Sequence, residues 1–99
     1  RATRFMRENL SATFSLDELA ANSFSSISHL NRLFRESTGF PPMAYFTQLR
    51  MVEACRLLAT TDAKISAVAI EVGYADPYHF SRVFKRVIGY SPSAYRQEH

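Results

Sequence analysis

The chain has 99 residues, of which 46% are hydrophobic and 21% charged. This composition excludes a disordered protein and favours one small globular domain, or two very small ones that share a core. Its single cysteine, Cys55, excludes an internal disulfide and a zinc site built from cysteines. The chain contains no run of about 18 apolar residues that could span a membrane. This absence favours a cytoplasmic protein. The net charge of +3 is compatible with nucleic-acid binding but does not establish it.

Capping residues, glycines and prolines divide the first part of the chain into four predicted helices. Apolar residues recur at helical spacing between these signals, and Ser15 with Glu18 has the form of a capping box. At a rise of about 1.5 Å per residue, the fourth helix would be about 28 Å long. The expected bounds are residues 2–10 with an end near Ser11, a second helix after Ser15, a third from Ser26 to Gly39, and a fourth from Pro42 to about Thr60.

The second part of the chain repeats this scheme with three further helices. Asp76 followed by Pro77 is typical of an N-cap and the first helical position, and Gly73 and Gly89 are typical helix ends. No segment alternates with the two-residue period of a strand. The sequence therefore predicts an all-α chain of seven helices, the last three spanning Ile65–Val72, Pro77 to Gly89, and Pro92 to Arg96.

An internal repeat is the most informative feature. Residues 24–45 match residues 74–95 without gaps at an offset of 50. Such self-similarity predicts a duplicated supersecondary unit. Among the matched pairs are His29 with His79, Arg32 with Arg82, Phe34 with Phe84, Gly39 with Gly89, Pro42 with Pro92, Tyr45 with Tyr95, Ser26 with Asp76, and Phe24 with Tyr74.

Each repeat reads as a short helix, a tight turn and a longer helix, the order of a helix-turn-helix unit. In that unit the second helix enters the major groove of DNA, so its outward residues need to be polar. Arginine can pair with guanine and asparagine with adenine. The outward positions are Ser28, Asn31, Arg32 and Arg35 in the first unit, and Tyr78, Ser81, Arg82, Lys85 and Arg86 in the second.

The residues DPYHFSRVFKR at 76–86, followed by GYSP at 89–92, resemble the signature of AraC/XylS-type transcriptional regulators. LNRLFR at 30–35, with Gly39 and Pro42, is similar to the first helix-turn-helix of that family. The resemblance implies a homeodomain-like, AraC-type DNA-binding domain over residues 1–99. Its expected parts are a first helix-turn-helix subdomain at 1–41, a linking helix at 42–60 and a second subdomain at 61–99.

By resemblance, the recognition helices at about 27–37 and 77–88 enter adjacent major-groove segments, about 34 Å apart along the DNA. The small Ser28 implies fewer base contacts in the first unit. The base contacts that the resemblance implies fall to Ser28, Asn31, Arg32, Tyr78, Ser81 and Arg82, and the phosphate contacts to Arg35, Lys85 and Arg86.

The expected partner is double-stranded promoter DNA, and the resemblance adds RNA polymerase as a second candidate, as for an activator. No cofactor, metal, membrane or enzymatic activity is expected. Because the chain begins at Arg1 in mid-pattern, we interpret it as a monomeric fragment whose effector or dimerisation domain lies elsewhere. Two alternatives stay open: a regulator that consists of this domain alone, and a protein-interaction module with the same fold.

Several of these residues also have a purely structural explanation. Arg82, Lys85 and Arg86 could form a solvated basic face, although the matched Arg32 and Arg35 favour contact with DNA. Asn31 and Ser81 are polar surface residues that need no special role. His29 and His79 are more typical of structural or phosphate-facing imidazoles than of metal ligands, and Cys55 of an inert, buried thiol.

Overall fold

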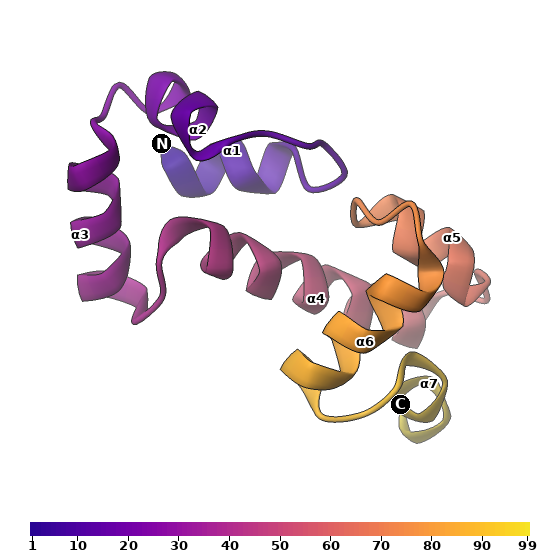
Figure 1. Ribbon diagram of the computed structural model, residues 1–99. Helices are drawn as coiled ribbons and strands as arrows, with labels where there is room; N and C mark the ends of the chain where they lie inside the picture. Colours follow the sequence, from indigo (N-terminus) through magenta and orange to yellow (C-terminus); the bar gives the residue numbers. More distant parts are fainter. The chain divides into compact units, whose positions relative to one another are not determined.

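The computed structural model describes all 99 residues and contains seven helices and no strand. This confirms the all-α prediction. Figure 1 shows the helices in chain order: α1 Ala2–Glu8, α2 Leu16–Asn22, α3 Ile27–Thr38, α4 Pro42–Thr60, α5 Ile65–Glu71, α6 Pro77–Ile88 and α7 Pro92–Glu98. No helix combines the length and the apolar character needed to span a bilayer.

Three helices, α2, α3 and α6, start at the predicted capping residues. Ser15 Oγ accepts from the Glu18 amide at 3.1 Å, and Glu18 Oε1 accepts from the Ser15 amide at 3.1 Å, which completes the capping box. Ser26 Oγ accepts from the third residue of α3 at 3.1 Å. Asp76 Oδ1 accepts from the second residue of α6 at 2.9 Å. Amide groups that a helix start would leave unpaired therefore find side-chain acceptors.

Three helix ends differ from the predicted ones. α1 stops at Glu8, before residue 10, because Asn9 Nδ2 donates to the Phe5 carbonyl at 2.8 Å and its backbone leaves the helical region at φ −131°. A side-chain donor of this kind competes with the backbone for the same carbonyl. α5 ends one residue early, with Val72 as its C-cap, and α7 continues past Arg96 to Glu98.

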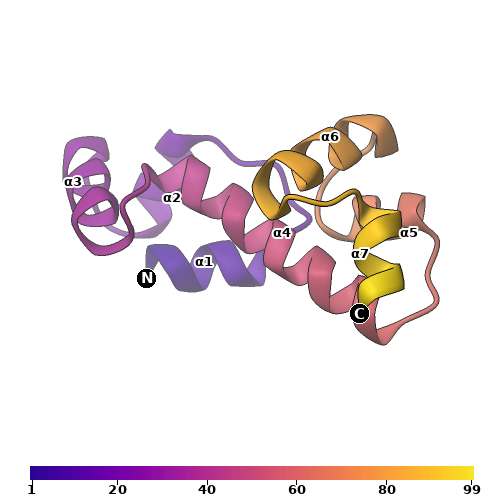
Figure 2. The same cartoon turned by 90° about the horizontal axis from the view of Figure 1, so that it is seen from below.

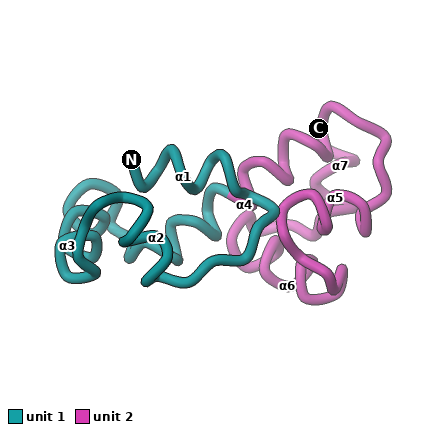
Figure 3. Tube along the Cα trace, turned by 90° about the horizontal axis from the view of Figure 1, so that it is seen from above, with its two compact units in different colours: residues 1–49 teal, residues 50–99 magenta.

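The chain folds into two compact units, residues 1–49 and residues 50–99, which Figure 3 shows in different colours. The boundary falls inside α4, so this helix contributes its first part to unit 1 and its second part to unit 2. Each unit has a hydrophobic core of its own. The finer division at residues 41 and 60 stays a prediction.

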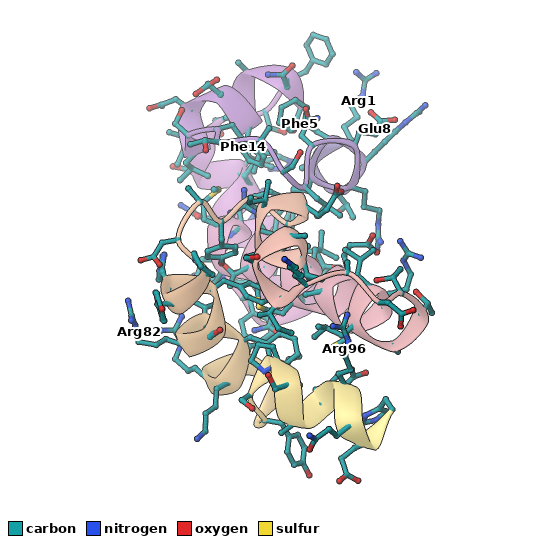
Figure 4. All side chains as sticks on the ribbon, turned by 90° about the vertical axis from the view of Figure 1, so that its right-hand side faces the viewer. Arg1, Phe5, Glu8, Phe14, Arg82 and Arg96 are labelled. Atoms are coloured by element: carbon teal, nitrogen blue, oxygen red, sulfur yellow. The ribbon has the colours of Figure 1, made fainter.

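The core of unit 1 joins α1, α2 and α3 to the first part of α4. An aromatic cluster contributes to it, since the Phe14 ring lies 5.0 Å from that of Phe5 and 4.7 Å from that of Phe46. Phe5 and Phe14 are labelled in Figure 4. The fully or almost fully buried members are Ala2, Met6, Phe14, Leu19, Ala20, Leu30, Phe34 and Phe46.

The core of unit 2 is built from the second part of α4 and from α5, α6 and α7, which gather around that part of α4 in Figure 2. Arg96 of α7 closes one edge of it. Its Nε donates to the Leu58 carbonyl at 3.0 Å and its Nη2 to the Thr61 carbonyl at 3.2 Å. These carbonyls lie at the end of α4, where a cationic donor is favourable.

The two helix-turn-helix units are α2–α3 and α5–α6, and their turns differ by one residue. Residues 23–26 separate α2 from α3, whereas residues 72–76 separate α5 from α6. In the turns, the Ser25 amide donates to Ala20 O at 3.0 Å and the Tyr74 amide to Ala69 O at 2.8 Å. Ser25 is therefore the structural equivalent of Tyr74, and the predicted pairing of Phe24 with Tyr74 is wrong. From α3 and α6 onward the offset of 50 holds.

Candidate nucleic-acid interface

The α3 helix has one buried and one polar face. Leu30 and Phe34 are buried in the core of unit 1. Ser28, Arg32 and Arg35 are exposed on the other face, and Asn31 is half-buried beside them. The positions that the sequence assigned to DNA contact in this helix are therefore accessible, with Asn31 at the edge of the exposed face.

The α6 helix repeats this arrangement. Its buried residues are Phe80, Val83 and Phe84. Tyr78, near the N-terminal end of the helix, is 77% exposed, and Ser81 is half-buried at the position equivalent to Asn31. The three cations Arg82, Lys85 and Arg86 are exposed. In Figure 4 the Arg82 side chain projects outward from α6.

None of the cations on the exposed faces of α3 and α6 is neutralised by a carboxylate. The ion pairs of the structure, between Arg4 and Glu8 and between Glu53 and Arg56, lie on other helices. Exposed guanidinium and ammonium groups without an acidic partner keep their donors available to phosphate or to base edges. Both faces can thus bind an anionic polymer.

The two equivalent histidines make different contacts. His29 Nδ1 lies 3.1 Å from Nη2 of Arg32, one turn further along α3. The His79 ring instead meets the Tyr74 ring edge-on, with 5.3 Å between centroids. Neither histidine belongs to a group of three or more side chains that could hold a metal ion, because the structure contains no such group.

The sequence did not reveal the environment of Arg50, which is half-buried in α4. Its Cζ lies 5.5 Å from the centroid of the Tyr74 ring. Burial lowers the pKa of Arg50 below its ordinary value, and Tyr74 partly offsets this shift. The sequence predicts surface or interhelix ion pairs for Arg50, Glu53 and Arg56, and the pair of Glu53 and Arg56 is observed, with two contacts of 2.8 Å.

Comparison with protein families assigns residues 19–98 to a family described as a helix-turn-helix domain. Among curated proteins, the MmsAB operon regulatory protein of Pseudomonas aeruginosa is 43% identical over 93 residues, which cover 94% of this chain and 30% of that protein. The transcriptional activator NphR of a Rhodococcus species is 36% identical, with 100% of this chain and 30% of that protein covered. The chain thus spans about a third of the length of such relatives.

Solved structures give the same assignment. The DNA-binding domain of AdpA, a global transcriptional factor solved in complex with a target DNA, has a TM-score of 0.89 and 33% identity, covering 98% of this chain and 87% of that one. An AraC-type transcriptional regulator from Chromobacterium violaceum has a TM-score of 0.92 and 28% identity, covering 98% and 87%. The two helix-turn-helix units and their seven helices are thus shared with domains of known structure.

Proposed function

Because this chain belongs to the AraC/XylS family of transcriptional regulators and is its helix-turn-helix DNA-binding domain, we propose that it reads a promoter sequence with α3 and α6 in adjacent major-groove segments. The observation that carries the proposal is the pair of exposed faces on α3 and α6. Each presents an arginine at the same position, Arg32 or Arg82, without an acidic partner. Packing of the two units alone would not require an exposed arginine at the same position in both helices.

Base contacts fall to the residues that face outward near the N-terminal half of each helix. Arg32 and Arg82 can each bind a guanine through two donors, and Asn31 can bind an adenine. Ser28, Tyr78 and Ser81 offer hydroxyl groups that accept and donate and are therefore less selective. The half-burial of Asn31 and Ser81 fits a role at the edge of the groove contact.

Phosphate contacts fall to Arg35, Lys85 and Arg86, which follow the base-reading positions along the helices. Such contacts supply most of the affinity, carry no sequence information and weaken as salt rises. The chemistry thus divides between the two groups of residues. One group selects the site, and the other holds the protein on the duplex.

In the whole protein, this domain would direct a regulator to its promoter in the bacterial cytoplasm. The relatives named as activators support activation, and RNA polymerase is the partner that activation requires. An effector or dimerisation domain would lie in the part of those proteins that this chain does not span. The alternative of a regulator with little beyond this domain is supported by AarP of Providencia stuartii, named a transcriptional activator, of which the chain covers 65% at 35% identity.

Selection of binding sites from a random duplex library tests the proposal. The wild-type chain, Arg32→Ala and Arg82→Ala would be selected in parallel at moderate salt. We expect one asymmetric motif in two blocks about one helical turn apart, with each variant losing a different block. No motif from the wild-type chain would favour the protein-interaction module. One block lost in both variants would contradict the assignment of one arginine to each block.

A further inference from the structure

The two recognition helices hold their equivalent arginines differently. Arg32 donates through Nη2 to the Nδ1 atom of His29, with 3.1 Å between the two nitrogens. Since a guanidinium has donors only, the imidazole nitrogen is the acceptor, and the ring proton lies on Nε2. Arg82 has no such contact, although His79 stands in the same place relative to it as His29 does to Arg32.

The turns before the two helices explain this difference. In unit 2 the buried Tyr74, which is 9% exposed, provides a ring for His79. In unit 1 the aromatic residue of the shorter turn is Phe24, which is 82% exposed and has a positive φ of 53°. Its ring lies under Arg1, 4.7 Å from the guanidinium carbon. His29 therefore packs against no aromatic ring and is left to face Arg32.

The contact matters because an exposed arginine samples many rotamers, and binding a base requires that it adopt one. A hydrogen bond to a residue on the preceding turn of the same helix restricts that choice before DNA arrives. One guanidinium hydrogen is used by His29, and the remaining donors are still available to O6 and N7 of a guanine.

We propose that His29 is a positioning residue that orients Arg32 for base contact, so that unit 1 reads its base pair with a preordered arginine and unit 2 with a free one. This inference rests on the proposed function, because it assumes that Arg32 reads a base. It assigns His29 no contact with DNA of its own. It also assigns the two equivalent histidines separate roles.

The test measures binding to the selected duplex and to duplexes altered at the base pair whose preference depends on Arg32. His29→Phe keeps a planar ring and removes the acceptor, whereas His29→Asn keeps an acceptor close to the position of Nδ1. His79→Phe is the matched control, since a phenyl ring preserves packing against Tyr74. Each variant is also combined with Arg32→Ala, and circular dichroism melts check that the fold is retained.

We expect His29→Phe to weaken binding to the selected duplex about three- to tenfold, the range of a single hydrogen bond, and to reduce discrimination at the base pair read by Arg32. His29→Asn should restore most of both, and His79→Phe should change neither. In the Arg32→Ala background, His29→Phe should have no further effect.

Three results would overturn the inference, and they are distinguishable from one another. If His29→Phe weakens binding equally with and without Arg32, His29 contacts DNA directly and does not act through the arginine. His29 also loses its positioning role if His29→Phe and His29→Asn both leave discrimination intact while Arg32→Ala abolishes it. If Arg32→Ala itself leaves every base preference unchanged, the assignment of Arg32 as a base reader fails, and the role of His29 fails with it.

Discussion

Glu36 and Arg86 occupy equivalent positions on α3 and α6, both are exposed, and their charges are opposite. Neither residue forms an ion pair in the structure. The exposed face of α6 therefore carries Arg82, Lys85 and Arg86, whereas that of α3 combines Arg32 and Arg35 with an acid. Of the two recognition helices, α6 has the stronger attraction for phosphate, and α3 carries a charge that opposes it.

Replacing Glu36 should therefore strengthen binding to any duplex. Glu36→Gln removes a negative charge from α3, and Glu36→Arg adds a cation as in α6, which should steepen the slope of log K against log salt by up to about 1. Titrations at several salt concentrations measure this slope. Asp62→Asn is the control, since Asp62 is an exposed acid outside the helices. If Asp62→Asn and Glu36→Gln increase the affinity for DNA equally, the effect comes from the net charge of the protein and not from the position of Glu36.

Arg82→Ala and Lys85→Ala should affect binding in different ways. Arg82→Ala should cost about 1–3 kcal/mol on the preferred site and relax the preference at one or two base pairs. Lys85→Ala should weaken binding to all sequences about equally and flatten the salt slope by about 1. Binding of each variant to the selected duplex and to a random duplex separates the two effects. If Arg82→Ala loses the same affinity for both duplexes, Arg82 does not contact a base.

The glycines after α3 and α6 should be sensitive to substitution. Gly39 and Gly89 end the two helices in the left-handed region, at φ 81° and 98°. A Cβ added at either position would meet no atom within 4 Å, so the cost of alanine is one of backbone conformation. We expect Gly39→Ala and Gly89→Ala each to lower the free energy of unfolding by about 1 kcal/mol. Asparagine should cost less, and urea denaturation that finds no difference between the two substitutions would contradict this explanation.

Most of the fold could be predicted from local signals, because four of the seven helices, α2, α3, α6 and α7, begin at a residue whose side chain caps the helix. Ser15, Ser26, Asp76 and Ser91 all accept the expected backbone hydrogen bonds. The end of α1 was harder to predict from the sequence, since it depends on whether the Asn9 side-chain amide reaches a carbonyl of its own helix.

The differences between the repeats could not be predicted, because matched residues meet different neighbours. Leu33 and Val83 are equivalent in sequence, yet Leu33 is 44% exposed and borders a pocket of about 280 Å³, while Val83 is 5% exposed in the core of unit 2. The contact of His29 with Arg32 likewise has no counterpart in unit 2, where the turn before the second helix is one residue longer. Such features arise from three-dimensional packing. An alignment of the two repeats matches residue types and gives no information about their neighbours in space.

Alkaline pH should destabilise unit 2 through Cys55 and Tyr95. Burial raises the pKa of the Cys55 thiol, and a hydrogen bond with Tyr95 offsets part of this shift. The same hydrogen bond, followed by burial, raises the pKa of Tyr95. Groups with raised pKa values in the folded state stabilise it fully below their unfolded values, about 8.5 for cysteine and 10 for tyrosine, and lose that contribution as the pH rises through the folded values.

The free energy of unfolding should therefore fall between about pH 8 and about pH 11, as measured by urea denaturation across this range. The part of the fall due to this pair should disappear in the double variant Cys55→Ala with Tyr95→Phe, and Cys55→Ala alone should remove the earlier part. Tyr45→Phe is the control, since Tyr45 is the equivalent tyrosine of unit 1 but has no cysteine partner. A fall that is the same in the wild type and the double variant would show that the alkaline sensitivity lies in other groups.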